Sequence, residues 1–162
     1  MNETPNQEIS KVTGIYVRVS TNDQNSGLES QIRTLKEYCE KNKIVSYQVF
    51  ADEGISGAKS SRPGLDRMMA EARQGKIDRV IVYSFSRFAR SVTHLLTALE
   101  EFRKLNVPFI SYTENVDTNS PMGRAFFVVI AAISQLEREL IVERVKNGLR
   151  NAKAKEAMDD RH

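Results

Sequence analysis

The sequence has a single cysteine and no long apolar run, and both absences narrow the possible classes of protein. Cys39 cannot form an internal disulfide, and one cysteine rules out a zinc site built from several. We therefore expect a reducing, cytoplasmic setting. A run of about 18 apolar residues is absent, which excludes a membrane-spanning helix. The N-terminus, MNETPNQEIS, carries acids and amides where a secretory signal has basic and then apolar residues, so we expect no such signal.

The chain has the size of a single domain, and its charges are nearly balanced. Its 162 residues can bury a proper core but are too few for two full enzymatic domains. Lysine and arginine total 24 against 21 aspartates and glutamates, which gives a formal net charge of +3. A balance this small permits a nucleic-acid partner without demanding one.

Short β-rich segments alternate with amphipathic segments as far as residue 120. Strands are predicted at four segments rich in Val, Ile, Tyr or Phe: 13–19, 45–51, 79–83 and 107–112. Helices are predicted where apolar residues recur at helical spacing: 28–41, 63–74 and 92–105. The alternation predicts an α/β fold, with a largely parallel sheet flanked by helices. Residues 1–11 are expected to be a disordered lead-in, and residues 12–120 the α/β core.

A Gly- and Ser-rich stretch, residues 52–62, is predicted to be a loop between the second strand and the second helix. It is longer than the roughly 2–6 residues of an ordinary βα connection, so it is either functional or merely mobile. Its end is marked by Arg62-Pro63-Gly64, because proline suits the first turn of a helix.

The last part of the chain predicts one long helix over residues 121–157. Ser120 suits its N-cap and Pro121 its first position. At about 1.5 Å per residue this helix is roughly 54 Å long, whereas a domain of this size is about 40 Å wide, so the helix should project. Residues 126–133 are apolar on every face, and we expect a partner chain to cover the side that the domain leaves open. A helix wrapped entirely by its own domain is the alternative.

Beyond Leu136 the same helix becomes basic. A basic projecting helix suits a phosphate backbone, although charge alone is equally compatible with a solvated helical face. The candidate DNA-binding residues are Arg144, Lys146, Arg150 and Lys153.

Polar side chains mark the end of the first predicted strand. Alternation along the strand directs Tyr16, Arg18 and Ser20 to one side. Parallel sheets build their sites at the carboxyl ends of strands, and Ser20 follows such an end. The pattern therefore aims a guanidinium and a hydroxyl in the same direction.

Two further arginines follow the third predicted strand. Arg87 and Arg90 are three residues apart, so they share a face if this segment is helical. With Arg62 from the long loop, four arginines are expected to converge on the hydroxyl of Ser20. Such a gathering of cations is costly unless an anion occupies the gap, and a guanidinium matches a phosphate well. Scattered surface arginines are the alternative.

These motifs, in this order, closely resemble the signature of the serine recombinases, the resolvase/invertase family. The likeness runs from Gly14 to about Lys155. The segments that carry it are 16–24, Gln31, 50–57, 62–66, 86–90, 121–124, 135–138 and 143–144.

The resemblance implies a specific chemistry. The serine matching Ser20 attacks a DNA phosphodiester, which leaves a 5′-phosphoserine linkage and a free 3′-hydroxyl. Arginines matching Arg18, Arg87 and Arg90 hold the scissile phosphate and stabilise its transition state. Supporting positions of the expected site are Tyr16, Gln24, Gln31, Asp52, Arg62, Ser86 and Arg138.

The resemblance also implies partners and a reaction course. The partner is double-stranded DNA, the protein forms homodimers along the long helix, and a synaptic tetramer exchanges strands by rotation. Transesterification keeps the energy of the ester, so religation needs no ATP, and no P-loop is present. Arginines can neutralise phosphate charge as a metal does, so neither a cofactor nor a metal is expected.

Two features depart from the family pattern. Ser86 stands where the family commonly has an acidic residue before the first catalytic arginine, so the rate and the proton route are in question. The general acid and base are not identified, since His94 and His162 are separated in sequence and neither has a base-like setting beside Ser20.

The family's DNA-recognition domain is not found after the long helix. Residues 158–162 form a short tail with no room for a helix-turn-helix, so we expect a catalytic-domain fragment of a longer protein rather than a natural short form. Sequence-specific binding by this fragment should be weak, because phosphate contacts position a protein but specify no site.

Two other functions remain open on sequence alone. A metal-dependent nuclease would use acids near strand ends, namely Asp52, Glu53, Glu114 and Asp117. Alternatively, the chain is a catalytically inactive module that dimerises through its long helix.

Overall fold

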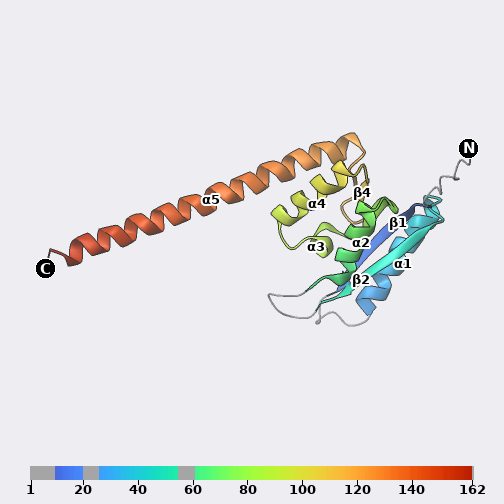
Figure 1. Ribbon diagram of the computed structural model, residues 1–162, viewed down its shortest axis with the longest axis horizontal. Helices are drawn as coiled ribbons and strands as arrows, with labels where there is room; N and C mark the ends of the chain where they lie inside the picture. Colours follow the sequence, from blue (N-terminus) through green and yellow to red (C-terminus); the bar gives the residue numbers. More distant parts are fainter. Residues whose placement is uncertain (1–9, 20–25, 55–60, 162) are drawn as a thin grey trace, which may run out of the picture.

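The computed structural model describes residues 10–19, 26–54 and 61–161. Its strands form one sheet in the order β2-β1-β3-β4-β5. They are β1 (Val12–Val19), β2 (Tyr47–Glu53), β3 (Ile77–Val82), β4 (Phe109–Ser111) and β5 (Val116–Asp117). β1 to β4 pair in parallel, and β5 runs antiparallel to β4. The helices are α1 (Ser26–Lys41), α2 (Pro63–Arg73), α3 (Phe85–Phe88), α4 (Val92–Lys104) and α5 (Pro121–Asp159) (Figure 1).

Successive residues of β1 enter two different cores, one on each face of the sheet. Ile15 and Val17 pack with Leu35 and Cys39 of α1. Tyr16 points to the other face, where the larger core includes Phe50 and side chains of α2 and α4. A parallel sheet buried on both faces explains why β1 is almost continuously apolar. The prediction of an α/β fold with a largely parallel sheet and a long C-terminal helix is confirmed.

The expected elements are present, with shifted ends. The second strand begins at Tyr47 rather than at residue 45, because Val45 is 92% exposed and pairing with β1 starts at Tyr47. It also continues through Asp52 to Glu53, so the predicted loop over 52–62 begins too early. Residues 55–60 of that loop, and residues 1–9 of the expected lead-in, lie outside the described residues. β5 is only two residues long and left no pattern in the sequence.

α5 leaves the domain after its first turns and projects far beyond it (Figure 1). Gly123, Ile130 and Ser134 are its buried residues, whereas Val128 and Val129 are 66% and 53% exposed. A helix wrapped fully by its own domain is therefore wrong. It ends at Asp159, two residues beyond the predicted end at 157. Within the described part of the chain, this and every other helix is too short or too polar to cross a membrane.

Gly123 lets α5 pack directly on the segment that follows β5. A Cβ at this position would lie 1.8 Å from the backbone oxygen of Asp117. We expect Gly123→Ala to lower the free energy of unfolding by about 1–3 kcal/mol, because the backbone must move to admit the methyl group. The measurement is urea unfolding followed by circular dichroism.

Gly148 provides the matched control on the same helix. A Cβ there would meet no atom within 4 Å. Gly148→Ala should leave the midpoint unchanged or raise it, since alanine is the better helix former by about 1 kcal/mol. Equal effects of the two substitutions would contradict this account of the α5 contact.

Candidate active site

The carboxyl ends of β1 and β3 lie side by side because the two strands are neighbours in the sheet. Tyr16 pairs with Val82, so the residues that follow each strand emerge at the same edge. Arg18 therefore lies next to the segment that follows β3. The ends of β1 and β3 are therefore adjacent in the sheet.

The guanidinium of Arg18 binds the backbone of α3. Its Nε donates a hydrogen bond to the carbonyl oxygen of Arg87 at 3.0 Å, and a terminal nitrogen donates to the carbonyl oxygen of Ser86 at 3.4 Å. α3 itself is fixed by Ser84, whose hydroxyl accepts the N–H of Arg87, and by the fully buried Phe88. Arg18 and Arg87 are thus held together through main-chain contacts.

Arg62 approaches the same place from the start of α2. It is buried and donates a hydrogen bond to the carbonyl oxygen of Phe88 at 2.5 Å. Burial lowers the pKa of Arg62, and the positive charges of Arg18 and Arg90 lower it further. Arg18, Arg62 and Arg90 form what we call the arginine cluster, and Arg87 adjoins it through its backbone. Arg87 and Arg90 would share a face only if both were helical, and α3 ends at Phe88, before Arg90.

Tyr16 and Asp52 form a buried pair at the start of α2, next to Arg62. The Tyr16 hydroxyl donates to Asp52 Oδ2 at 2.9 Å, and Asp52 also accepts the N–H groups of Gly64 and Leu65 at 2.7 and 3.0 Å. A buried carboxylate at the start of a helix is favourable because it satisfies N–H groups that have no partner within the helix. Burial raises the pKa of Tyr16, as do its hydrogen bond to Asp52 and that carboxylate's charge, so the phenol stays a donor. The pair anchors the start of α2, and Arg62 immediately precedes it.

Gln31 binds the end of β1 from α1. Its side-chain nitrogen donates to the carbonyl oxygen of Arg18 at 3.3 Å. Its side-chain oxygen is buried and has no hydrogen-bond partner among the described residues. Gln31 therefore contacts the main chain of Arg18, and its role in the site stays a prediction.

Ser86 is exposed, and its hydroxyl lies 3.1 Å from that of Ser84. Its backbone oxygen accepts from Arg18, but its side chain brings no negative charge to the cluster. Because Ser86 is uncharged, the contacts described above hold the guanidinium of Arg18 by two carbonyl oxygens and by no carboxylate.

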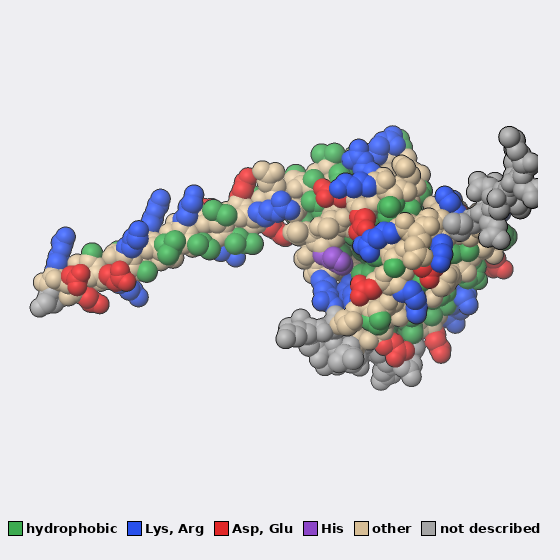
Figure 2. Space-filling model, in the orientation of Figure 1, with side chains coloured by type: hydrophobic (Ala, Val, Ile, Leu, Met, Phe, Trp, Pro, Cys, Tyr) green, Lys and Arg blue, Asp and Glu red, His purple; other side chains and the backbone are tan. Residues whose placement is uncertain are grey.

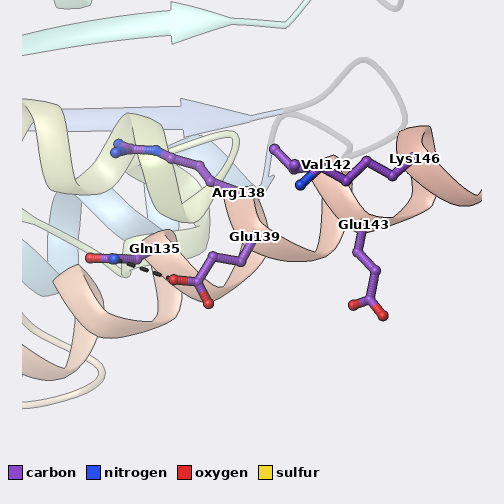
Figure 3. Close-up of a pocket in the computed structure, with 6 residues that line it drawn as sticks. All are labelled: Gln135, Arg138, Glu139, Val142, Glu143 and Lys146. Atoms are coloured by element: carbon purple, nitrogen blue, oxygen red, sulfur yellow. Dashed lines mark hydrogen bonds between the residues drawn. The ribbon is translucent and has the colours of Figure 1, made fainter.

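Arg138 takes part in none of the contacts described above. Ser20 and Gln24 lie outside the described residues. Arg138 is exposed on α5, one turn beyond Ser134, whose hydroxyl lies 3.2 Å from that of Thr93 in α4. Figure 3 shows Arg138 directed back along the helix, in a shallow hollow lined by side chains of α5 alone: Gln135, Arg138, Glu139, Val142, Glu143 and Lys146.

The four candidate DNA-binding residues divide between two sides of α5. Lys146, Arg150 and Lys153 follow one another at spacings of four and three, so they share a face. Arg144 precedes Lys146 by two residues, which is about 200° around an α-helix. The basic side chains stand out from the projecting part of the helix in Figure 2. Three of the four thus lie on one side of the helix.

Sequence reasoning gave no role in this site to two residues that the structure connects to it. Glu114, in the turn between β4 and β5, accepts the N–H of Phe85 at 3.2 Å and the hydroxyl of Ser111. It thereby holds the start of α3. His94 accepts a hydrogen bond from the backbone of Arg90. The sequence signal that could have pointed to His94 is the pattern Ser91-x-x-His94 at the start of α4. It resembles a capping box with histidine in place of glutamate.

Two of the four acids proposed for a metal site bind helix starts instead. Asp52 caps α2 and Glu114 holds α3. The described residues contain no group of three or more His, Cys, Asp or Glu arranged to hold a metal ion.

The chain is thus an α/β domain with several arginines at the carboxyl edge of its parallel sheet and a long helix that projects beyond it. Residues 13–158 match the family model "Resolvase, N terminal domain". The chain is 41% identical over 140 residues to the serine recombinase gin of Escherichia phage Mu, covering 86% of this chain and 67% of that protein. It is also 41% identical to the transposon Tn917 resolvase of Enterococcus faecalis, covering 86% of this chain and 70% of that protein.

A solved structure agrees with these relatives. The N-terminal catalytic domain of TP901-1 integrase superposes with a TM-score of 0.68 at 37% identity, covering 80% of this chain and 98% of that one. The chain belongs to the resolvase/invertase family of serine recombinases and is a catalytic domain of a site-specific DNA recombinase. It spans about two thirds of the length of the curated relatives described here. Membership implies DNA as substrate and an oligomeric assembly.

Proposed function

We propose that Ser20 attacks a DNA phosphodiester while Arg18, Arg62, Arg87 and Arg90 neutralise the phosphate. The Ser20 hydroxyl gives up its proton as its oxygen forms a bond to phosphorus, the bond from phosphorus to the 3′-oxygen breaks, and that oxygen takes up a proton and leaves as a hydroxyl. The 5′-phosphoserine ester is later attacked by a 3′-hydroxyl, which restores a phosphodiester and frees the serine. One ester replaces another at each step, so neither ATP nor a reductant is needed.

One observation carries this proposal: the arginine cluster at the end of β1, where Ser20 follows directly in the chain. Burial lowers the pKa of Arg62, and the charges of Arg18 and Arg90 lower it further; a bound anion would offset the repulsion between these guanidiniums. A phosphoryl transition state spreads negative charge over its oxygens, and fixed guanidiniums stabilise that charge. Gln31 contacts the main chain of Arg18, and the Tyr16–Asp52 pair anchors the start of α2 beside Arg62.

We further propose that homodimers form along α5 and pair into a tetramer on double-stranded DNA. Val129, Ile133, Leu136 and Leu140 are all exposed and recur at spacings of four, three and four residues. This spacing makes one apolar stripe, of the kind that a second helix covers. Farther along, Lys146, Arg150 and Lys153 supply a basic face for the phosphate backbone. A cytoplasmic setting is part of the same proposal, since the only thiol is the buried Cys39.

The proposal predicts a covalent intermediate that forms without metal. Duplexes with a random central sequence and 3′ labels, incubated with the protein in EDTA and quenched with detergent, should yield labelled protein. Digestion and mass spectrometry should then locate a nucleotide on Ser20. Cleavage that requires a divalent cation and leaves no protein adduct would favour the nuclease, and binding without any adduct would favour the inactive module.

A further inference from the structure

His94 connects the start of α4 to the arginine cluster. It is the third residue of α4, and its own N–H is capped by the hydroxyl of Ser91 at 3.1 Å. Its ring is half-buried and stacks on Phe88, with the centroids 6.0 Å apart and the planes 12° apart. In this position Nδ1 accepts a hydrogen bond from the backbone N–H of Arg90 at 3.3 Å. The side chain therefore ties the backbone of Arg90 to a helix that is packed in the core.

The surroundings of the ring favour its neutral form. The charged groups that face it are Arg62, which precedes α2, and Arg90, which lies between α3 and α4. Burial lowers the pKa of His94, and the charges of these two arginines lower it further. The N-terminal end of α4 also disfavours a cation. An Nδ1 that accepts a hydrogen bond leaves the ring proton on Nε2.

We propose that His94 is a positioning residue for the arginine cluster, and that it makes DNA cleavage depend on pH through its hydrogen bond with Arg90. The inference rests on the proposed function, which assigns Arg90 to the scissile phosphate. Neutral His94 holds Arg90 in place. Protonation turns the Nδ1 acceptor into a donor facing the N–H of Arg90, and it adds a third cation beside Arg62 and Arg90. The contact then breaks and the cluster loosens.

The sign of the pH effect follows from the lowered pKa. The folded state binds a proton on His94 less readily than the unfolded chain, in which histidine titrates near 6.5. Stability therefore also declines as the pH falls through about 6.5, so unfolding midpoints must be followed alongside the rates. A purely structural histidine would change the midpoints without changing the rate of the folded protein.

Two substitutions separate the hydrogen bond from the stacking. His94→Asn keeps an acceptor oxygen near the place of Nδ1 and does not titrate. His94→Phe keeps a ring against Phe88 and has no acceptor. Single-turnover formation of the covalent adduct is measured between pH 5.5 and 8 for both variants and the parent chain, at temperatures where each is folded.

The parent chain should lose rate progressively as the pH falls below 6.5, by at most about tenfold at pH 5.5, because a lowered pKa leaves part of the His94 population neutral there. His94→Asn should match it at pH 8 and lack most of this acid loss, whereas His94→Phe should be slow throughout. If His94→Asn lost rate at low pH as the parent chain does, or if His94→Phe reacted at the parental rate, the role of His94 would be wrong. The proposed function of Ser20 and the arginines would be unaffected. If the parent chain forms no adduct at any pH, the proposed function fails and this inference fails with it.

Discussion

Ser20→Ala is expected to abolish the covalent protein–DNA adduct while leaving the fold and the oligomeric state intact. The methyl group has no oxygen to attack phosphorus, and a neighbouring side chain cannot take over an in-line attack that depends on position. The loss should therefore reach the detection limit of the labelled-duplex assay rather than a partial rate. Sedimentation and urea unfolding should match the parent chain, since the change removes one hydroxyl.

Ser46→Ala is the matched control for this substitution. Ser46 is exposed just before β2, and its backbone oxygen, which accepts the N–H of Thr13, is unaffected by the change. Adduct formation should be unchanged in this variant. An undiminished adduct in Ser20→Ala would remove Ser20 from the proposed role and require another nucleophile.

Arg18→Lys is expected to slow adduct formation by about 10²–10³-fold, the cost of losing one preorganised donor to a transition-state oxyanion. Arg18 uses Nε and a terminal nitrogen to bind the carbonyl oxygens of Arg87 and Ser86, which fixes the plane of its guanidinium. A lysine ammonium keeps the charge but has no planar fork, so it cannot keep both contacts and also present a donor to phosphate in the same geometry. The rate is measured at saturating DNA, where it is separate from weakened binding.

Arg33→Lys is the corresponding control, because Arg33 is exposed on α1 and the change preserves charge there as well. Its adduct rate should stay within about twofold of the parent value. A normal rate in Arg18→Lys would mean that charge alone suffices at this position. The backbone contacts of Arg18 would then serve the fold rather than the reaction.

Local patterns predicted most of the fold. β-branched runs and helical spacing located the strands and helices, and Ser120-Pro121 located the start of α5 within one residue. They failed where the local signal was short or ambiguous. β5 is a pair of residues, and Asp52 was predicted to lie in a loop although it is buried at the end of β2. A buried carboxylate is stable there only because Tyr16, Gly64 and Leu65 donate to it, and these partners are distant in sequence.

The candidate site shows the same division. Motif order predicted Arg18, Arg62, Arg87 and Arg90 as site residues. Spacing would give two of them a shared face only within a helix, and α3 is too short to include both. His94 was passed over because it is far from Ser20 along the chain, whereas folding sets its ring against Phe88 and the backbone of Arg90. Glu114 was considered only as a metal ligand, and its contact with α3 spans 29 residues of sequence.

By itself, the sequence determined the α/β alternation, the family motifs and a helix too long and too apolar for one small domain to cover. Periodicity and motif order are local properties, so they can be read along the chain. Only the tertiary structure decided which arginines come together, which carboxylate is a cap and which histidine supports them. Those relations depend on the neighbouring positions of β1 and β3 in the sheet and on the packing of α2, α3 and α4 at its edge, which bring together groups that no spacing rule connects.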